Sequence, residues 1–167
     1  MPESEFYWLS DDSNEYRYYI IGGYKSSIDN YPVLRYPSRC HEISECVDLA
    51  SDKSGVRETD IVRSFTKNIK KIEQSKNIVK VSSDGFDFNN VETIELSLNL
   101  MYIGQQFFTY CKKIKRVTIP AGIIKIENGA FDGCDNLTIN LKIQKDYIIG
   151  APWGATNATI NWNYTGE

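Results

Sequence analysis

The sequence predicts a mainly β solenoid with short helical turns, an aromatic-rich amino-terminal cap and a carboxyl-terminal capping strand. Three observations favour this class. Apolar residues recur every 22 or 23 positions through the second half of the chain, a period typical of stacked repeat units. Within each period, apolar and polar residues alternate over short stretches, as they do in half-buried strands. The chain has 167 residues, of which 41% are hydrophobic, so it can form one core but not two large domains.

The repeat is clearest between residues 94–114 and 117–137, which match at a shift of 23. The matching pairs are Ile94 with Val117, Leu96 with Ile119, Leu100 with Ile123, Ile103 with Ile126, Phe108 with Phe131, Cys111 with Cys134 and Ile114 with Leu137. A shift of 22 adds Ile72, Ile78, Val81 and Phe86 on one side, and Ile139, Leu141, Ile148 and Trp153 on the other. One unit cannot bury its apolar face alone, so we expect the units to stack. The aromatic residues Phe86, Phe108, Phe131 and Trp153 should then form one row.

One unit shows how each segment is expected to fold. Val117 and Ile119 alternate with a polar residue, which predicts a short strand with one face inward, and Pro120 ends that strand. The apolar segment 123–126 directs two more side chains inward, and residues 128–131 predict a single helical or 3₁₀ turn that carries the aromatic residue. Cys111 and Cys134 then belong to a column of small buried side chains.

Residues 1–60 predict an amino-terminal cap and a degenerate first repeat. Two aromatic-rich strands are expected in FYWL at residues 6–9 and in YRYYIIGGY at residues 16–24, with Gly22 and Gly23 forming a turn or a bulge. LRYP at residues 34–37 echoes VTIP at residues 117–120. A first unit is therefore expected to begin there, with Val47 and Leu49 in a further strand.

Residues 61–167 predict an amphipathic helix followed by the stacked repeats and a carboxyl-terminal cap. The helix is expected over residues 60–72, because apolar residues follow at spacings of four, four and three. These residues are Ile61, Phe65, Ile69 and Ile72, and the other side of the helix carries Arg63, Lys67 and Lys70. The basic side favours a solvated helix face, with partner docking as the alternative. At the carboxyl end, alternation of Ile160, Trp162 and Tyr164 with asparagines predicts a final strand over the last unit.

Few residues suggest catalysis or metal binding. His41 is the sole histidine, so a histidine-activated thiol would have to be Cys40 or Cys46. Neighbouring side chains on an extended segment point in opposite directions, which favours a surface histidine over a catalytic one. The four cysteines lack the paired spacing of a zinc site, which favours buried thiols. No phosphate-binding, dinucleotide-binding or hydrolase motif occurs, and we expect a non-enzyme with no cofactor or metal.

Charge differs between the two parts of the chain. Residues 1–60 hold twelve acids and six bases, whereas residues 61–167 hold ten acids and thirteen bases. The basic clusters are either a nucleic-acid patch or a solvated face. Because glutamates are interleaved and no nucleic-acid motif accompanies the bases, the solvated face is favoured and no specific nucleic acid is expected. No apolar run is long enough to span a bilayer, and no signal peptide is visible at the amino terminus.

The segment VTIPAGIIKIENGAFDGCDNL at residues 117–137 resembles the repeat of BspA-like leucine-rich repeat proteins. The likeness is looser over residues 94–114, where Ser97 replaces the proline and Phe107 the alanine, and it covers the chain from Ile72 onward. The closing sequence GAPWGATNATINWNY is similar to the tail of leucine-rich repeat proteins of phages and prophages. The resemblance implies a leucine-rich-repeat solenoid that is either incorporated in a phage particle or active in the host cytoplasm. Synthesis in the cytoplasm is expected because no signal peptide is visible.

The outward-facing residues of the predicted strands form the candidate contact surface, since short polar residues on a rigid sheet lose little entropy on binding. The candidate partner-binding residues are Lys71, Glu73, Thr93, Glu95, Arg116, Thr118, Asn140 and Lys142. An idle hydrated sheet and a surface made of the amino-terminal tyrosines are the alternatives. We expect a non-enzymatic module that recognises a protein or a cell-surface glycan, first as a phage-tail-associated or surface adhesin. A small phage-encoded inhibitor of a host defence protein and a structural component of a tail or fibre are the other candidates, with the oligomeric state left open.

Overall fold

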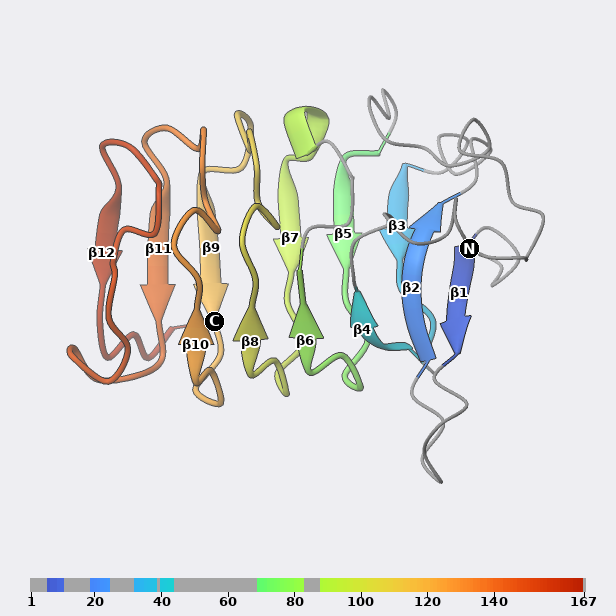
Figure 1. The fold of residues 1–167 in the computed structure, drawn as a ribbon. Helices are drawn as coiled ribbons and strands as arrows, with labels where there is room; N and C mark the ends of the chain where they lie inside the picture. The colour runs from blue at the N-terminus through green and yellow to red at the C-terminus, as the bar shows by residue number, and fades with distance from the viewer. Residues whose placement is uncertain are drawn as a thin grey trace.

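The computed structural model describes residues 6–10, 19–24, 32–38, 40–43, 69–82 and 88–166. Over these residues the chain is a β-solenoid, in which successive turns stack in line from β1 at one end to β12 at the other (Figure 1). From β3 to β10, each turn places one short strand in each of two facing layers, whereas β11 and β12 lie in the second layer alone. The mainly β class predicted from the repeat is therefore confirmed.

The first layer is a sheet of six strands in the order β1-β2-β4-β6-β8-β10. Its strands are β1 (Phe6–Ser10), β2 (Tyr19–Tyr24), β4 (Cys40–Ile43), β6 (Lys80–Val81), β8 (Tyr102–Ile103) and β10 (Lys125–Ile126). The β1–β2 pair is antiparallel, whereas all the other neighbours run parallel. Parallel pairing follows from the repeat, because equivalent segments of successive turns run in the same direction.

The second layer contains two sheets of three strands each, in the orders β3-β5-β7 and β9-β11-β12. The strands are β3 (Val33–Arg35), β5 (Lys71–Glu73), β7 (Thr93–Glu95), β9 (Arg116–Ile119), β11 (Thr138–Leu141) and β12 (Thr159–Asn161). All pairs within these two sheets are parallel. We call the outer surface of these six strands the split face, because strand pairing stops between β7 and β9.

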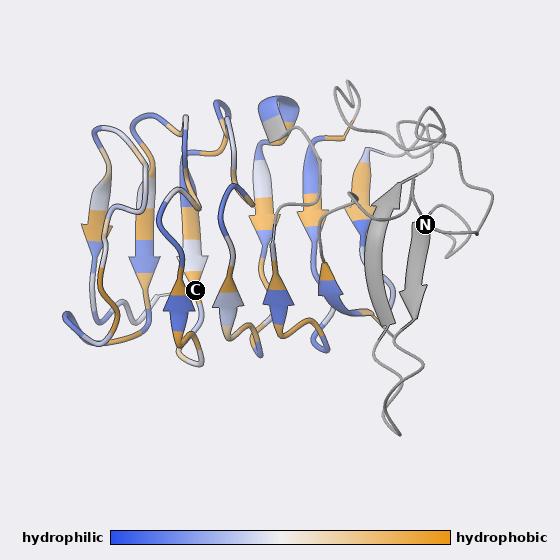
Figure 2. Cartoon of the chain, in the orientation of Figure 1, coloured by the Kyte–Doolittle hydropathy of each residue, from blue (hydrophilic) through white to orange (hydrophobic). Residues whose placement is uncertain are grey.

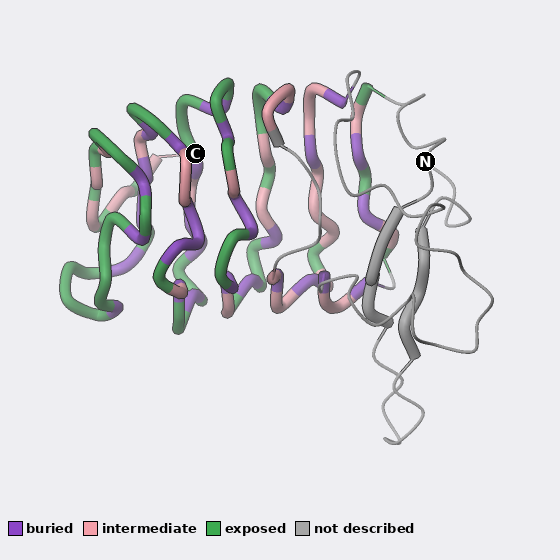
Figure 3. The backbone as a smooth tube through the Cα atoms, turned by 45° about the horizontal axis from the view of Figure 1, so that its top comes forward, coloured by how far each residue is buried: buried purple, intermediate pink, exposed green. Residues whose placement is uncertain are grey.

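The strand registers match the columns predicted from the sequence period. In the second layer Ile72 pairs with Ile94, and Val117 with Ile139. In the first layer Val81 and Ile126 both pair with Ile103. Hydrophobic and hydrophilic bands alternate along the strands (Figure 2), and buried stretches recur on successive turns (Figure 3). The side-chain period of two thus directs the same position of every turn into the core.

The aromatic residues form the expected row inside the solenoid. The rings of Phe108 and Phe131 stack with centroids 4.7 Å apart and an interplanar angle of 5°. The Trp153 ring follows at 6.4 Å from Phe131, and the Trp162 ring lies at 6.3 Å from Trp153. These distances lie in the range at which aromatic pairs attract one another. Three of the four predicted members are confirmed, while Phe86 lies outside the described residues.

The two aromatic-rich segments near the amino terminus are strands. They form β1 and β2, and the register between them shifts so that Gly22 has no partner, which makes it a bulge and not a turn. The segment that echoes the repeat at residues 34–37 begins on β3, where Leu34 pairs with Ile72 on β5. Val47 and Leu49 lie outside the described residues.

Of the two helical segments predicted from the sequence, the longer one needs correction. The helix expected over residues 60–72 is wrong at its carboxyl end, since Lys71–Glu73 is strand β5, and residues 60–68 lie outside the described residues. Pairing of β5 with strands on both sides overrides the helical spacing of its apolar residues. Residues 128–131 form the predicted single turn, in which Ala130 N donates to Glu127 O and Asp132 N donates to Gly129 O, each across three residues. The helical segment that the described residues do contain is the 3₁₀ turn η5 (Phe88–Asn90).

The strand in the carboxyl-terminal cap is shorter than the strand predicted over Ile160, Trp162 and Tyr164. Strand β12 ends at Asn161, but the alternation continues, with Trp162 and Tyr164 half-buried and Asn163 exposed. The amides of Asn163 and Tyr164 donate to the carbonyls of Ile143 and Leu141 at 3.0 and 2.9 Å. The tail therefore runs beside the end of β11 and continues the cap without further strand pairing.

Candidate functional site

A groove of about 530 Å³ lies on the split face where β7 and β9 stop pairing. Five of the eight predicted partner-binding residues line it: Thr93, Glu95, Arg116, Thr118 and Lys142. The remaining lining is aliphatic and consists of Ile94, Leu96, Leu98 and Pro120. The structure thus brings residues from three successive turns together around an apolar floor. We call this feature the β7–β9 groove.

The apolar floor departs from the sequence prediction. Ile94 and Leu96 were expected in the core, yet both are only half-buried, whereas the equivalent Val117 and Ile119 are buried. Ser97 stands where the next turn has Pro120, and the side chain of Leu98 is 77% exposed. Ile94 and Leu96 still pack against the core. Their outer surfaces therefore remain accessible in the groove.

The charges of β3, β5 and β7 neutralise one another along the split face. Arg35 pairs with Glu73 at 2.5 Å, Glu73 with Lys71 at 2.9 Å, and Lys71 with Glu95 at 2.5 Å. Hydrogen bonds from Lys71 and Arg35 hold the pKa of Glu73 below its ordinary value. Hydrogen bonds to Glu95 and Glu73 raise the pKa of Lys71. Lys71 and Glu73 thus form a compensated ladder beside the groove and do not line it.

Arg116 and Lys142 are the uncompensated charges of the groove. Both side chains are exposed, and neither has an ion pair with any residue that the structure describes. Glu95, the carboxylate that lines the groove, already pairs with Lys71. The groove therefore carries a net positive charge at the edge formed by β9 and the end of β11.

Asn140 was predicted to face solvent, and this prediction is wrong. Its side chain is 1% exposed, and its Oδ1 accepts a hydrogen bond of 2.9 Å from Asn161 Nδ2. Asn140 lies on the central strand β11, in register with Thr118 on one side and Asn161 on the other. These cross-strand neighbours cover it. Its buried Nδ2 has no partner among the described residues, and it is not available at the surface.

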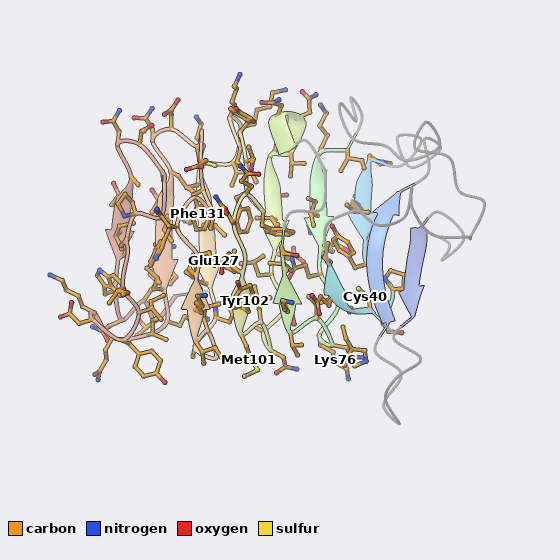
Figure 4. The ribbon with its side chains drawn as sticks, viewed as in Figure 1. Cys40, Lys76, Met101, Tyr102, Glu127 and Phe131 are labelled. Carbon is orange, nitrogen blue, oxygen red and sulfur yellow. The ribbon has the colours of Figure 1, made fainter. Side chains whose placement is uncertain are left out.

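The first layer presents a different arrangement of charge. Lys80 pairs with Glu42 at 2.6 Å and Lys125 with Glu127 at 3.0 Å. Both ammonium groups lie over the ring of Tyr102, at 5.7 and 5.4 Å from its centroid (Figure 4 labels Tyr102 and Glu127). Burial, together with a hydrogen bond to Glu127, raises the pKa of Tyr102 to about 12. The cations described on these strands are thus partnered, in contrast to those of the β7–β9 groove.

The described cysteines are buried, and the histidine lies on β4. Cys40, Cys111 and Cys134 are buried free thiols, which confirms that prediction for three of the four; Cys46 lies outside the described residues. Cys134 Sγ donates to the Phe108 carbonyl at 2.7 Å, and a hydrogen bond with Cys111 lowers the pKa of Cys134. His41 lies half-buried on β4. No group of three potential metal ligands occurs among the described residues.

Sequence reasoning missed the aliphatic residues of the groove. Leu98 and Pro120 were not candidates, and Ile94 and Leu96 were assigned wholly to the core. A signal existed in the replacement of the repeat's proline by Ser97, followed by an apolar residue in a turn. That signal marks an irregular turn, but it does not show that strand pairing ends beside it.

In the part of the chain that the structure describes, no helix has the length and hydrophobicity that a membrane span requires.

The comparisons with known proteins agree with the repeat. The comparison with curated proteins finds no match. A family model described as BspA type leucine rich repeat region (6 copies) matches residues 63–150, which is more than half of the chain. Together with the solenoid, in which equivalent residues of successive turns pair in register, this match shows that the chain belongs to the BspA-type leucine-rich repeat family.

Proposed function

We propose that this chain is a non-enzymatic scaffold that binds a protein partner through the split face. Its family is a repeat-scaffold family, and scaffolds of this kind present extended surfaces on a rigid stack. The observation that carries the proposal is the β7–β9 groove, where five of the predicted contact residues surround an exposed aliphatic floor. Protein interfaces combine such an apolar centre with a polar rim.

The size and chemistry of the groove support binding more than catalysis. Its volume of about 530 Å³ lies within the range of roughly 300–1,000 Å³ typical of ligand sites. Its charged members are Glu95, Arg116 and Lys142, and it contains neither a thiol nor a histidine among its lining residues. The hydroxyl groups of Thr93 and Thr118 have no histidine beside them among the lining residues to act as a base, so the lining favours holding a partner's side chain over activating it.

The biological setting follows from the sequence resemblance and is proposed on that basis. The closing segment of the chain is similar to the tail of phage and prophage proteins, which favours a tail-associated or surface adhesin. A phage-encoded inhibitor of a host defence protein is the second setting, and a component of a tail or fibre is the third. The exposed side chains of Ile149 and Tyr147 near the β12 end favour assembly as an additional role. Light scattering on the purified chain would show assembly as a mass above 19.1 kDa.

The experiment that tests binding through the split face compares two surface variants. Leu98→Asp places a charge on the groove floor, and Ile124→Asp places the same charge on another exposed aliphatic residue outside the groove. Both full-length variants should keep the parent's circular dichroism spectrum and unfolding temperature, because both side chains are exposed. Proteins that the parent chain captures from host cells are identified by mass spectrometry. The most enriched protein is then purified and titrated separately against the parent chain, Leu98→Asp and Ile124→Asp.

We expect the purified partner to bind the parent and Ile124→Asp equally, and to bind Leu98→Asp at least about tenfold more weakly, as for a residue central to an interface. Equal binding by Leu98→Asp would show that the partner does not use the split face. A partner lost equally by both variants would also contradict the proposal, because the effect would not be specific to the groove.

A further inference from the structure

The break between β7 and β9 differs from every other junction described on the split face. Strand β5 pairs with β7 in register, as β9 does with β11. Among the described residues, no backbone hydrogen bond joins β7 to β9, although the two strands are close neighbours. The β7–β9 groove therefore lies at the point where strand pairing on the split face is interrupted.

Charge complementarity identifies the kind of partner that fits. The ladder from Arg35 to Glu95 is compensated within itself, so it offers no net charge to a ligand. Arg116 and Lys142 line the groove without a carboxylate partner among the described residues. Two cations on one side of a groove attract carboxylates, and the hydroxyl groups of Thr93 and Thr118 add hydrogen-bonding capacity at its edge.

The aliphatic surface continues beyond the groove. Leu98 lines both the β7–β9 groove and an adjacent hollow of about 500 Å³ that also contains Met101. The two side chains are 77% and 44% exposed. Leu98 forms an exposed aliphatic ridge between the two hollows. A branched side chain of a partner can pack against this ridge from either hollow. This ridge requires the partner to carry an aliphatic residue next to its charges.

We infer that the β7–β9 groove recognises an acidic peptide segment that carries a large aliphatic side chain, with carboxylates at Arg116 and Lys142 and the aliphatic group on Leu96 and Leu98. This inference rests on the proposed function and names the partner's chemistry at the same site. The occupant is a protein segment and not a nucleic acid. Two cations fall short of the roughly six to ten phosphate contacts made by a DNA-binding protein with strongly salt-dependent affinity.

The test uses three fluorescein-labelled peptides and the full-length chain, with binding followed by fluorescence anisotropy. The probe is a nine-residue peptide of alternating Glu and Asp with a central Leu. In its amide twin every carboxylate is replaced by Gln or Asn, and in its glycine twin the Leu is replaced by Gly. A fluorescein-labelled ten-nucleotide oligothymidine serves as the nucleic-acid probe.

The charge variant is Arg116→Gln with Lys142→Gln, and the matched control is Lys112→Gln with Lys113→Gln, which removes two exposed cations outside the groove. We expect the acidic peptide to bind the parent and the control equally, and the charge variant about tenfold more weakly, as for two exposed ion pairs of about 0.7 kcal/mol each. Binding to the parent should weaken with salt. The amide and glycine twins should each bind the parent more weakly than the probe.

Several results would overturn the inference. One is equal binding of the acidic peptide and its amide twin to the parent, and another is equal loss in the charge variant and the matched control. The inference would also be overturned if the acidic peptide did not bind the parent chain at millimolar concentration. The same holds if oligothymidine bound the parent more tightly than the acidic peptide does and lost this binding in the charge variant. These outcomes are separate from failure of the proposed function. If Leu98→Asp loses the purified partner while the charge variant keeps it, the split face binds a protein but does not select acidic segments.

Discussion

The aromatic row should be the least replaceable part of the solenoid, and Phe131→Ala tests this. Phe131 is fully buried and lies between Phe108 at 4.7 Å and Trp153 at 6.4 Å. Removing a buried phenylalanine side chain costs about 3–5 kcal/mol, and the lost aromatic pairing is part of that effect. A domain of this size is stable by about 5–15 kcal/mol. We therefore expect Phe131→Ala to remove a large share of the free energy of unfolding.

Urea unfolding followed by tryptophan fluorescence measures this loss, because Trp153 and Trp162 follow Phe131 in the same row. Phe131→Leu is the matched control. It keeps more of the buried volume than alanine does and leaves a smaller cavity, so it should cost clearly less than Phe131→Ala. In a stack where each turn contacts only its neighbours, the damage should also be local. Amide hydrogen exchange should therefore accelerate more in β11 and β12 than in β3 and β5.

The reasoning would be refuted if Phe131→Ala lost less than about 1 kcal/mol. Such a value would mean that the ring does not couple the turns on its two sides. Uniform acceleration of hydrogen exchange from β3 to β12 would contradict the second part, because the solenoid would then unfold as one cooperative unit. Both outcomes concern the described core and are independent of partner binding.

Two further predictions concern pH. The difference in absorbance between the parent and Tyr102→Phe should show one phenol titrating near a pKa of about 12, because burial and Glu127 favour the neutral phenol. The stability that the neutral Tyr102 side chain contributes is present below the ordinary tyrosine pKa and is lost as pH rises through about 12. A titration at the ordinary value would contradict the packing of Tyr102. Because Lys71 and Arg35 lower the pKa of Glu73, Glu73→Gln should destabilise the chain at pH 7 by less than about 1 kcal/mol, the value of an exposed pair. The difference in urea unfolding should shrink as pH falls below the ordinary glutamate pKa and vanish once pH has passed through the lowered pKa of Glu73. A difference that stays the same until the whole chain unfolds in acid would refute the ion-pair explanation.

The sequence period predicted the columns of the core with few errors. Ile72, Ile94, Val117 and Ile139 were placed together because they recur at 22 or 23 residues. The strand registers pair Ile72 with Ile94 and Val117 with Ile139. The aromatic row followed from the same period. A repeat fixes these positions because each turn must bury its apolar face on the next one, and a shift by one residue would expose the whole column.

The candidate site was predicted only in part. Alternation within each strand identified Thr93, Arg116 and Thr118 as outward-facing, and these residues do line the groove. It failed for Asn140, which faces outward by period yet is covered by its cross-strand neighbours. Alternation along a strand predicts on which side of the sheet a side chain lies. It does not predict whether neighbouring side chains cover it.

By itself, the sequence determined that this chain is a capped β repeat whose apolar residues stack in columns, because the period of 22 or 23 residues reflects the geometry of each turn. Only the tertiary structure decided that hydrogen bonding stops between β7 and β9 and that Leu98 and Pro120 join Arg116 and Lys142 around the resulting groove. The physical reason is that strand pairing depends on how closely two whole turns approach each other. That distance is set by the packing of all their side chains together, and no local pattern encodes it.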